Sequence, residues 1–280
     1  MHHGIKRMVV TFGKFVRTGA PIDRGRLRIA FCIFGLSAIT GLAGDLGKFK
    51  RIESFQYRTQ EPGGVERAFI LESAQPPQET DSFTQLRIRT LGEPEFVLKN
   101  EYAWWVKYNS SPNWLSHRKN VFTSQYVFGL RTKFGQVPHT LVILIGPPFG
   151  SSPGSLHVLA LEGSKPPVVL LHKEKLDLVG VRESDGDGVP EIIGAPCTSQ
   201  EWGDHLLTYD PLHVYTLRQG GQAELSIPLS RAYNQAHYYG WVGPDCSEDW
   251  AVVLHPPNGG KPVIMKAADA EKLQQPTPKK

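Results

Sequence analysis

The sequence predicts a mainly β protein, a propeller-like array of short antiparallel strands in four or five blades, complete or incomplete, with one short helix. The 280 residues include 28 glycines and 22 prolines, and this abundance of turn residues favours many short strands over long helices. A weak repeat indicates the same fold, because the motifs Ile-Gly-Pro, Ile-Gly-Ala-Pro and Val-Gly-Pro begin at residues 145, 193 and 242. Four-stranded propeller blades repeat about every 40–50 residues.

Charge is concentrated at the amino terminus. Residues 1–43 carry seven basic side chains and one acidic side chain, so the rest of the chain, with 24 basic and 26 acidic residues, is slightly acidic. A sequence pI near 8.9 therefore does not indicate a nucleic-acid-binding protein, and no nucleic-acid partner is predicted. The basic stretch is instead typical of a targeting segment.

That targeting segment leads into an apolar run at residues 29–43. Fifteen mostly apolar residues suit the core of a signal peptide, and Gly41 and Ala43 supply the small residues that cleavage requires. We therefore expect residues 1–43 to be a signal peptide and the protein to be exported to a periplasmic, extracellular or envelope location. The alternative is an uncleaved anchor, which would leave residues 29–43 in a membrane.

Two cysteines remain after residue 43. Cys197 and Cys246 form an even pair, which suits an oxidising compartment. A disulfide between them would close a 49-residue loop and stabilise the fold by roughly 4 kcal/mol in the chain-entropy model. Two buried free thiols are the alternative.

The predicted β domain spans residues 44–265 and contains short apolar, β-branched runs bounded by turn residues. A helix is expected at Ser230–Tyr239, with Ser230 as its N-cap and Gly240 as its stop. Residues 266–280, rich in Ala, Gln, Pro and Lys, are expected to form a flexible tail. The strand candidates are 68–71, 86–89, 126–130, 140–145, 155–161, 168–171, 176–181, 206–209 and 213–217.

An acidic loop in this domain predicts a metal site. Glu183, Asp185, Asp187 and Glu191 occupy the first, third, fifth and ninth positions of a nine-residue segment, with glycine at the fourth and sixth. Calcium takes six to eight oxygen ligands, which alternating acidic residues on a tight turn can supply. An EF-hand is excluded, because its twelfth position needs Glu and strands rather than helices flank this loop. A plain β-hairpin turn remains open, because Asp-Gly pairs favour such turns without any metal.

The segment 183–191, followed by Ile192-Ile193-Gly194-Ala195-Pro196, resembles the FG-GAP or VCBS repeat of integrin-type β-propellers. In that family an acidic D-x-D-G-D-G-x-x-D loop binds calcium and leads into a strand that ends in Gly-Ala-Pro. The resemblance implies a structural calcium ion held by side-chain oxygens of Glu183, Asp185, Asp187 and Glu191 and by the backbone carbonyl of Val189. It covers about fifteen residues and departs from the family in using Glu at the first and last positions.

The expected role is a binding or structural module rather than an enzyme, and no catalytic residue is assigned. Trp104, Trp105 and Trp114 form a candidate binding surface that could stack on the sugars of a glycan or on apolar groups of a protein partner. Two rival hypotheses stay open. One is an exported hydrolase acting on polysaccharide or peptide, using the acidic and histidine side chains at 201–205 and 237. The other is a membrane-anchored envelope component.

Overall fold

Strands dominate the part of the chain that the structure describes. The structure is a computed structural model that describes residues 49–59, 64–73, 82–105, 119–148, 150, 152–246 and 250–274. The predicted signal segment at 1–43 lies outside these ranges, as do Trp114 and residues 275–280. Neither helix of the described ranges is both long and apolar enough to cross a bilayer.

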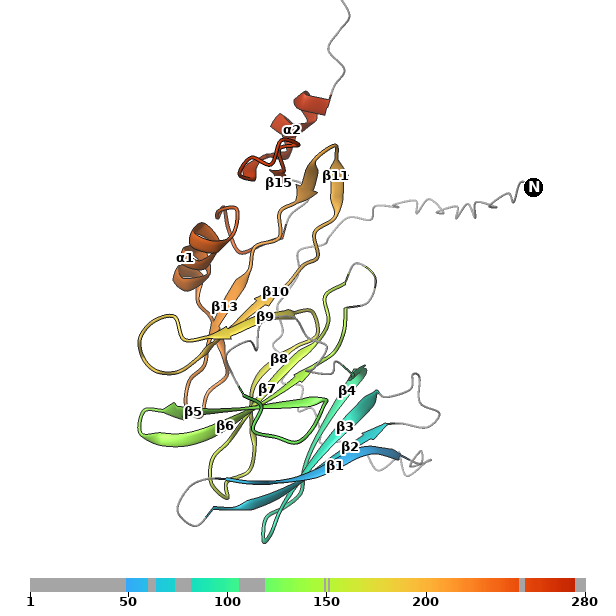
Figure 1. Cartoon of the computed structure of the whole chain (residues 1–280), viewed down its shortest axis with the longest axis vertical. Coiled ribbons are helices and arrows are strands. Elements are labelled where there is room, and N and C mark those ends of the chain that lie inside the picture. The colour runs from blue at the N-terminus through green and yellow to red at the C-terminus, as the bar shows by residue number, and fades with distance from the viewer. Residues whose placement is uncertain are drawn as a thin grey trace, which may run out of the picture. The chain divides into compact units, whose positions relative to one another are not determined.

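The first two sheets each contain four strands that pair in chain order with antiparallel neighbours (Figure 1). Turn residues join the strands where the chain reverses, for example at Gly135, whose positive φ of 60° suits the tight turn between the strands that end at residue 134 and begin at residue 137. The first sheet comprises β1 (Lys50–Arg58), β2 (Glu66–Ser73), β3 (Phe83–Thr90) and β4 (Phe96–Trp104). The second comprises β5 (Val127–Phe134), β6 (Val137–Ile145), β7 (Leu156–Leu161) and β8 (Val168–Lys173).

The chain alternates between the third and fourth sheets. The third has the order β14-β13-β10-β9 and the fourth the order β11-β12-β15-β16, so the chain leaves the third sheet after β10 and returns to it at β13. The third sheet contains β9 (Asp177–Arg182), β10 (Glu191–Ala195), β13 (His213–Thr216) and β14 (Glu224–Leu225). The fourth contains β11 (Glu201–Gly203), β12 (Leu206–Thr208), β15 (Ala251–Leu254) and β16 (Val263–Lys266). Helix α1 (Ile227–His237) precedes β15, and helix α2 (Ala267–Gln274) follows β16.

The second sheet is buried on both faces, which explains its continuously apolar strands. Val142 and Leu144 of β6 belong to one core cluster, shared with β1, β2 and β3 of the first sheet. Leu141 and Ile143 belong to another, shared with β9, β10 and β13 of the third sheet. Successive side chains of a strand point to opposite faces, so an unbroken apolar run is what a sheet packed on both sides requires.

The prediction of a mainly β chain is confirmed, and every predicted strand segment overlaps a strand of the structure. The helix, however, begins one turn earlier than expected. Ser226 is its N-cap and accepts a hydrogen bond from the backbone N–H of Leu229, and Pro228 stands in the first turn, where its missing N–H costs nothing. Ser230 lies buried inside the helix, and its Oγ donates to the carbonyl of Ser226 and accepts from the N–H of Val214.

Two further expectations need correction. Of the segment 266–280 that was expected to be a tail, residues 267–274 form α2 instead, because Ala267 and Ala270 are buried against β15 and β16. The third occurrence of the repeat motif, at Val242, lies in a loop, whereas Ile145 and Ile193 lie in the second strands of their sheets. The spacing of 48 residues between these two isoleucines thus connects the second strands of two sheets, whereas the next interval ends in a loop.

His157 makes stability depend on pH. The side chain is fully buried, its Nδ1 accepts a hydrogen bond of 3.1 Å from Trp104 Nε1, and burial next to His172 lowers its pKa to about 3. Between pH 6.5 and pH 3 this histidine is protonated in the unfolded protein but not in the folded protein. Its contribution to stability is therefore fully present above pH 6.5 and is lost as the pH falls toward 3. We expect the free energy of unfolding to fall by up to about 1.4 kcal/mol per pH unit in this window through this one group.

Thermal or urea unfolding of the wild type and of His157→Gln across that pH window measures the effect. Glutamine keeps an acceptor for Trp104 but does not titrate, so the variant should lose less stability per pH unit than the wild type. Burial also lowers the pKa of His213, so some slope will remain, and the comparison depends on the difference between the two slopes. Equal slopes would show that His157 does not carry the effect.

Candidate metal centre

The acidic loop connects two paired strands of the third sheet. Residues 183–190 join β9 to β10, and the pairing of Arg182 with Glu191 closes the loop at its base. Gly186 and Gly188 have φ angles of 86° and 81°, in the left-handed region that glycine adopts without strain. The backbone therefore turns at each of the two glycines, and these turns bring Asp187 back toward Glu183 and Asp185.

Three carboxylates of the loop converge. One oxygen from each of Glu183, Asp185 and Asp187 lies within 4.8 Å of the others, and all three residues are exposed. Backbone N–H groups orient them: Gly186 donates to Glu183, Asp187 donates to Asp185 Oδ1 at 3.1 Å, and Val189 donates to Asp187 Oδ1 at 2.6 Å. Each carboxylate keeps a second oxygen that these contacts leave available.

Glu191 adds a buried carboxylate at the end of this loop. The residue is 2% exposed, and its Oε2 is buried with no hydrogen-bond partner among the described residues. Burial raises its pKa; hydrogen bonds from Ser184 oppose the rise, and the neighbouring charge of Asp185 adds to it. Burying a carboxylate oxygen without a partner is costly, so this oxygen needs either a proton or a cation.

The donor set fits a hard divalent cation. Carboxylate oxygens are the ligands that calcium and magnesium prefer, and three of the four expected carboxylates converge. Glu191 is not in that group, and no histidine or thiol joins it among the described residues. Val189 is buried and lies between Asp187 and Glu191 in the chain, so its backbone is near the expected ligands. The loop is also a hairpin connection, as the alternative hypothesis requires. The orphaned Oε2 of Glu191 is the feature that a simple turn does not explain.

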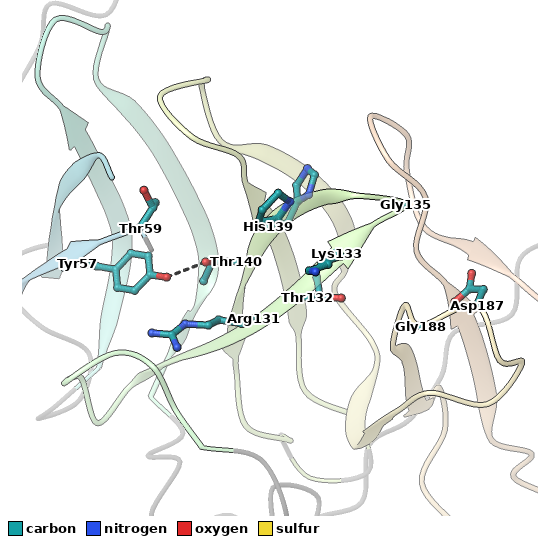
Figure 2. A pocket seen from close by; sticks show the side chains of 11 residues that line it. Tyr57, Thr59, Arg131, Thr132, Lys133, Gly135, His139, Thr140, Asp187 and Gly188 are labelled. Carbon is teal, nitrogen blue, oxygen red and sulfur yellow. Dashed lines mark hydrogen bonds between the residues drawn. The ribbon is translucent and has the colours of Figure 1, made fainter. Parts of the chain in front are cut away.

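A cavity of about 550 Å³ adjoins the loop (Figure 2). Asp187 and Gly188 form one wall, Tyr57 of β1 and Thr59 just after that strand contribute to another, and the hairpin of β5 and β6 supplies the rest. Figure 2 shows Asp187 on the opposite side of the β5–β6 hairpin from Tyr57. Parts of three sheets thus meet at one cavity. Its volume lies within the range of small-molecule sites.

Trp104 does not belong to the expected binding surface. Trp104 is fully buried in the core, where its ring contacts Phe83 and its Nε1–H donates to His157. It therefore cannot stack on a ligand. Trp105 is half-buried, and Trp114 lies outside the described residues. For Trp104, the aromatic residues that suggested a binding site belong to a core instead.

The structure joins Cys197 to Cys246, the pair expected from the sequence. Their Cα atoms are 6.4 Å apart, within the range that a disulfide allows. Cys197 lies where the chain leaves the third sheet after β10, and Cys246 lies on the later crossing between α1 and β15. The bond therefore links the segment between β10 and β11 to the segment between α1 and β15, two places where the chain passes from the third sheet to the fourth.

The acidic and histidine residues of the hydrolase hypothesis do not come together. Glu201 lies in β11, Asp204 and His205 form the turn to β12, and His237 ends α1, where its ring stacks on Tyr233. Across the described ranges, the one group of three or more His, Cys, Asp or Glu ligands found close enough to hold a metal ion is Glu183, Asp185 and Asp187.

Sequence reasoning missed the cavity and its two basic side chains, Arg131 and Lys133 of β5. A signal was present in the alternation of that strand. Val127 and Gly129 precede Arg131 and Lys133 at every second position, so the face that is apolar at the start of the strand becomes basic toward its end. Nothing in the sequence indicates which other strands this face meets.

Comparison with known proteins identifies no relative: no family model, no curated protein and no solved structure matches this chain.

Proposed function

We propose that this chain is an exported, calcium-stabilised, propeller-like β module that binds a protein or glycan partner. The observation that carries the calcium site is the convergence of three carboxylates, and the buried, unpartnered Oε2 of Glu191 at the end of the same loop supports it. A calcium ion would neutralise acids that otherwise repel one another and would tie the end of β9 to the start of β10. Its role would be structural, because it would hold a loop that forms one wall of the cavity.

The propeller-like arrangement is supported by four antiparallel sheets of four strands, the unit from which propeller blades are built. The likeness of the loop to FG-GAP or VCBS repeats favours the same architecture. In a regular propeller the four strands of each blade are consecutive in the chain. Here β11 and β12 of the fourth sheet lie in sequence between β10 and β13 of the third sheet. We therefore propose a variant propeller in which the chain alternates between the last two blades. The bonded cysteines favour export, because disulfides persist in oxidising compartments.

Replacing both Asp185 and Asp187 by Asn should abolish stabilisation by calcium. For the calcium-depleted wild type, calcium at about 100 times its dissociation constant would raise the free energy of unfolding by about 2.7 kcal/mol. In a domain of this size that corresponds to a rise in melting temperature of roughly 5–10 °C. Calorimetric binding and thermal melts measure both quantities. The matched control is Glu201→Gln with Asp204→Asn, which removes two exposed acidic charges at another turn. A double variant that still responds to calcium would place the site elsewhere.

Glu191→Gln should have opposite effects with and without calcium. Without the ion, the variant should be more stable than the wild type at neutral pH, because it removes a desolvated charge whose pKa is raised by burial. With saturating calcium, the wild type should be the more stable protein, because glutamine supplies a weaker ligand. Melting both proteins with and without calcium tests this reversal. If the order of stability stays the same, Glu191 is a protonated core residue and not a ligand.

A further inference from the structure

Two basic side chains that pair with no carboxylate of the described residues line the cavity beside the loop. Arg131 and Lys133 are exposed, stand two residues apart on β5 and therefore lie on the same face of the strand. Neither forms an ion pair with any carboxylate that the structure describes. Arginines elsewhere on the surface do have such partners: Arg89 pairs with Glu95, and Arg218 pairs with Glu224.

A buried pair of hydroxyls lies on the same wall. Tyr57 and Thr140 are 6% and 5% exposed, and their oxygens are 2.8 Å apart in a hydrogen bond that Figure 2 marks. Only one of the two hydroxyls donates in this bond, so the hydrogen of the other is available to a ligand. Thr140 stands opposite Arg131 in the register of β5 and β6, which places the hydroxyl and the guanidinium on one face as neighbours.

The remaining charged groups of the cavity do not compensate the two cations fully. His139 is already engaged, with Nε2 3.3 Å from the Glu162 carboxylate and Nδ1 2.9 Å from the Val137 carbonyl. Among the described residues of the lining, Asp187 is the single acidic one, and it belongs to the candidate metal centre. If calcium takes up the Asp187 carboxylate, the cavity becomes more positive.

We propose that this cavity binds the oxyanion group of a small ligand, a carboxylate, sulfate or phosphate. Arg131 supplies two parallel N–H donors, Lys133 supplies charge, and the Tyr57–Thr140 pair supplies a neutral donor. The inference deepens the binding role proposed above by naming the ligand class, and it rests on that role for its biological setting. Calcium at the loop should strengthen anion binding, and anion binding should strengthen calcium binding by the same factor.

The test is a titration of the full chain with sodium sulfate, acetate or phosphate, followed by NMR chemical shifts or calorimetry at constant ionic strength maintained with chloride. The protein is first depleted of calcium and dialysed free of chelator, because chelators are themselves anions. The variant Arg131→Gln with Lys133→Gln is compared with Arg231→Gln with Lys261→Gln, which removes two exposed charges outside the cavity lining. The three anions distinguish carboxylate from sulfate and phosphate as the preferred group.

We expect saturable binding of at least one anion, weakened roughly tenfold or more in the cavity variant and unchanged in the control. No saturable binding of any probe, or equal weakening in both variants, would overturn the proposal. The sulfate and acetate titrations are then repeated with calcium. Anion binding that calcium does not affect would support the cavity while contradicting its coupling to the loop. Calcium binding to a protein that binds no anion would contradict the cavity alone.

Discussion

Replacing Arg67 by methionine is expected to lower the free energy of unfolding by about 3–5 kcal/mol. Arg67 is fully buried, and its guanidinium joins two sheets. Nη1 donates to Thr90 Oγ1 at 2.9 Å within the first sheet, and Nη2 donates to the carbonyls of Gly163 and Lys165 at 2.6 and 2.7 Å. Those carbonyls belong to the turn between β7 and β8 of the second sheet. Methionine keeps most of the side-chain length but leaves both carbonyls without this donor.

Urea unfolding or thermal melting measures the loss, which corresponds to roughly 10 °C in melting temperature for a domain of this size. Arg87→Met is the matched control, because Arg87 lies in the adjacent strand and pairs with Glu72 and Glu95 near the surface. Such partly exposed pairs contribute about 1 kcal/mol or less. Arg67→Lys should fall between the two, since lysine keeps the charge and loses the planar array of donors. Equal losses in Arg67→Met and Arg87→Met would contradict the assignment of Arg67 as a link between sheets.

The residue pattern predicts the strands of this fold better than it predicts their partners. The run from Thr140 to Ile145 is short, apolar and rich in β-branched residues, and it forms β6 as expected. The same information cannot show that β11 and β12 leave the third sheet and that β13 returns to it, because their pairing depends on contacts with β15, some 40 residues later. Similarly, Ser226 and Ser230 are both suitable N-caps by composition, and tertiary packing of Ser230 against Val214 decides between them.

The candidate site also has one part that could be predicted from the sequence and one part that could not. The acidic loop could be found from sequence because its ligands lie within nine consecutive residues, and local backbone turns bring three of them together. The cavity could not, because Tyr57, Arg131 and Asp187 come from three sheets and meet only in the folded chain. Trp104 shows the opposite error. Its aromatic neighbours in sequence indicated a surface, whereas its indole N–H is satisfied by His157 inside the core.

Gly154→Ala is expected to destabilise the protein by about 3 kcal/mol or more, through steric overlap with backbone rather than loss of a contact. A Cβ at residue 154 would stand 1.9 Å from the Gly146 carbonyl oxygen and 2.8 Å from the Pro147 carbonyl carbon. Backbone atoms cannot swing aside as a flexible side chain can. The segment is also fixed by hydrogen bonds, because the N–H of Gly154 donates to Asp177 Oδ1 at 2.6 Å and its carbonyl accepts from Leu176. Relieving the overlap must therefore disturb the start of β7 and its connection to β9.

Gly180→Ala provides the matched control, since Gly180 is also a buried glycine but its added Cβ would meet its nearest neighbours at 3.8 Å, an ordinary contact. That substitution should be neutral or stabilising by up to about 1 kcal/mol, because alanine restricts the unfolded chain more than glycine does. Thermal melts of the two variants separate backbone overlap from the general effect of removing a glycine. A melting temperature for Gly154→Ala within a degree or two of that for Gly180→Ala would mean that the close approach of residues 146 and 154 is not a constraint on this fold.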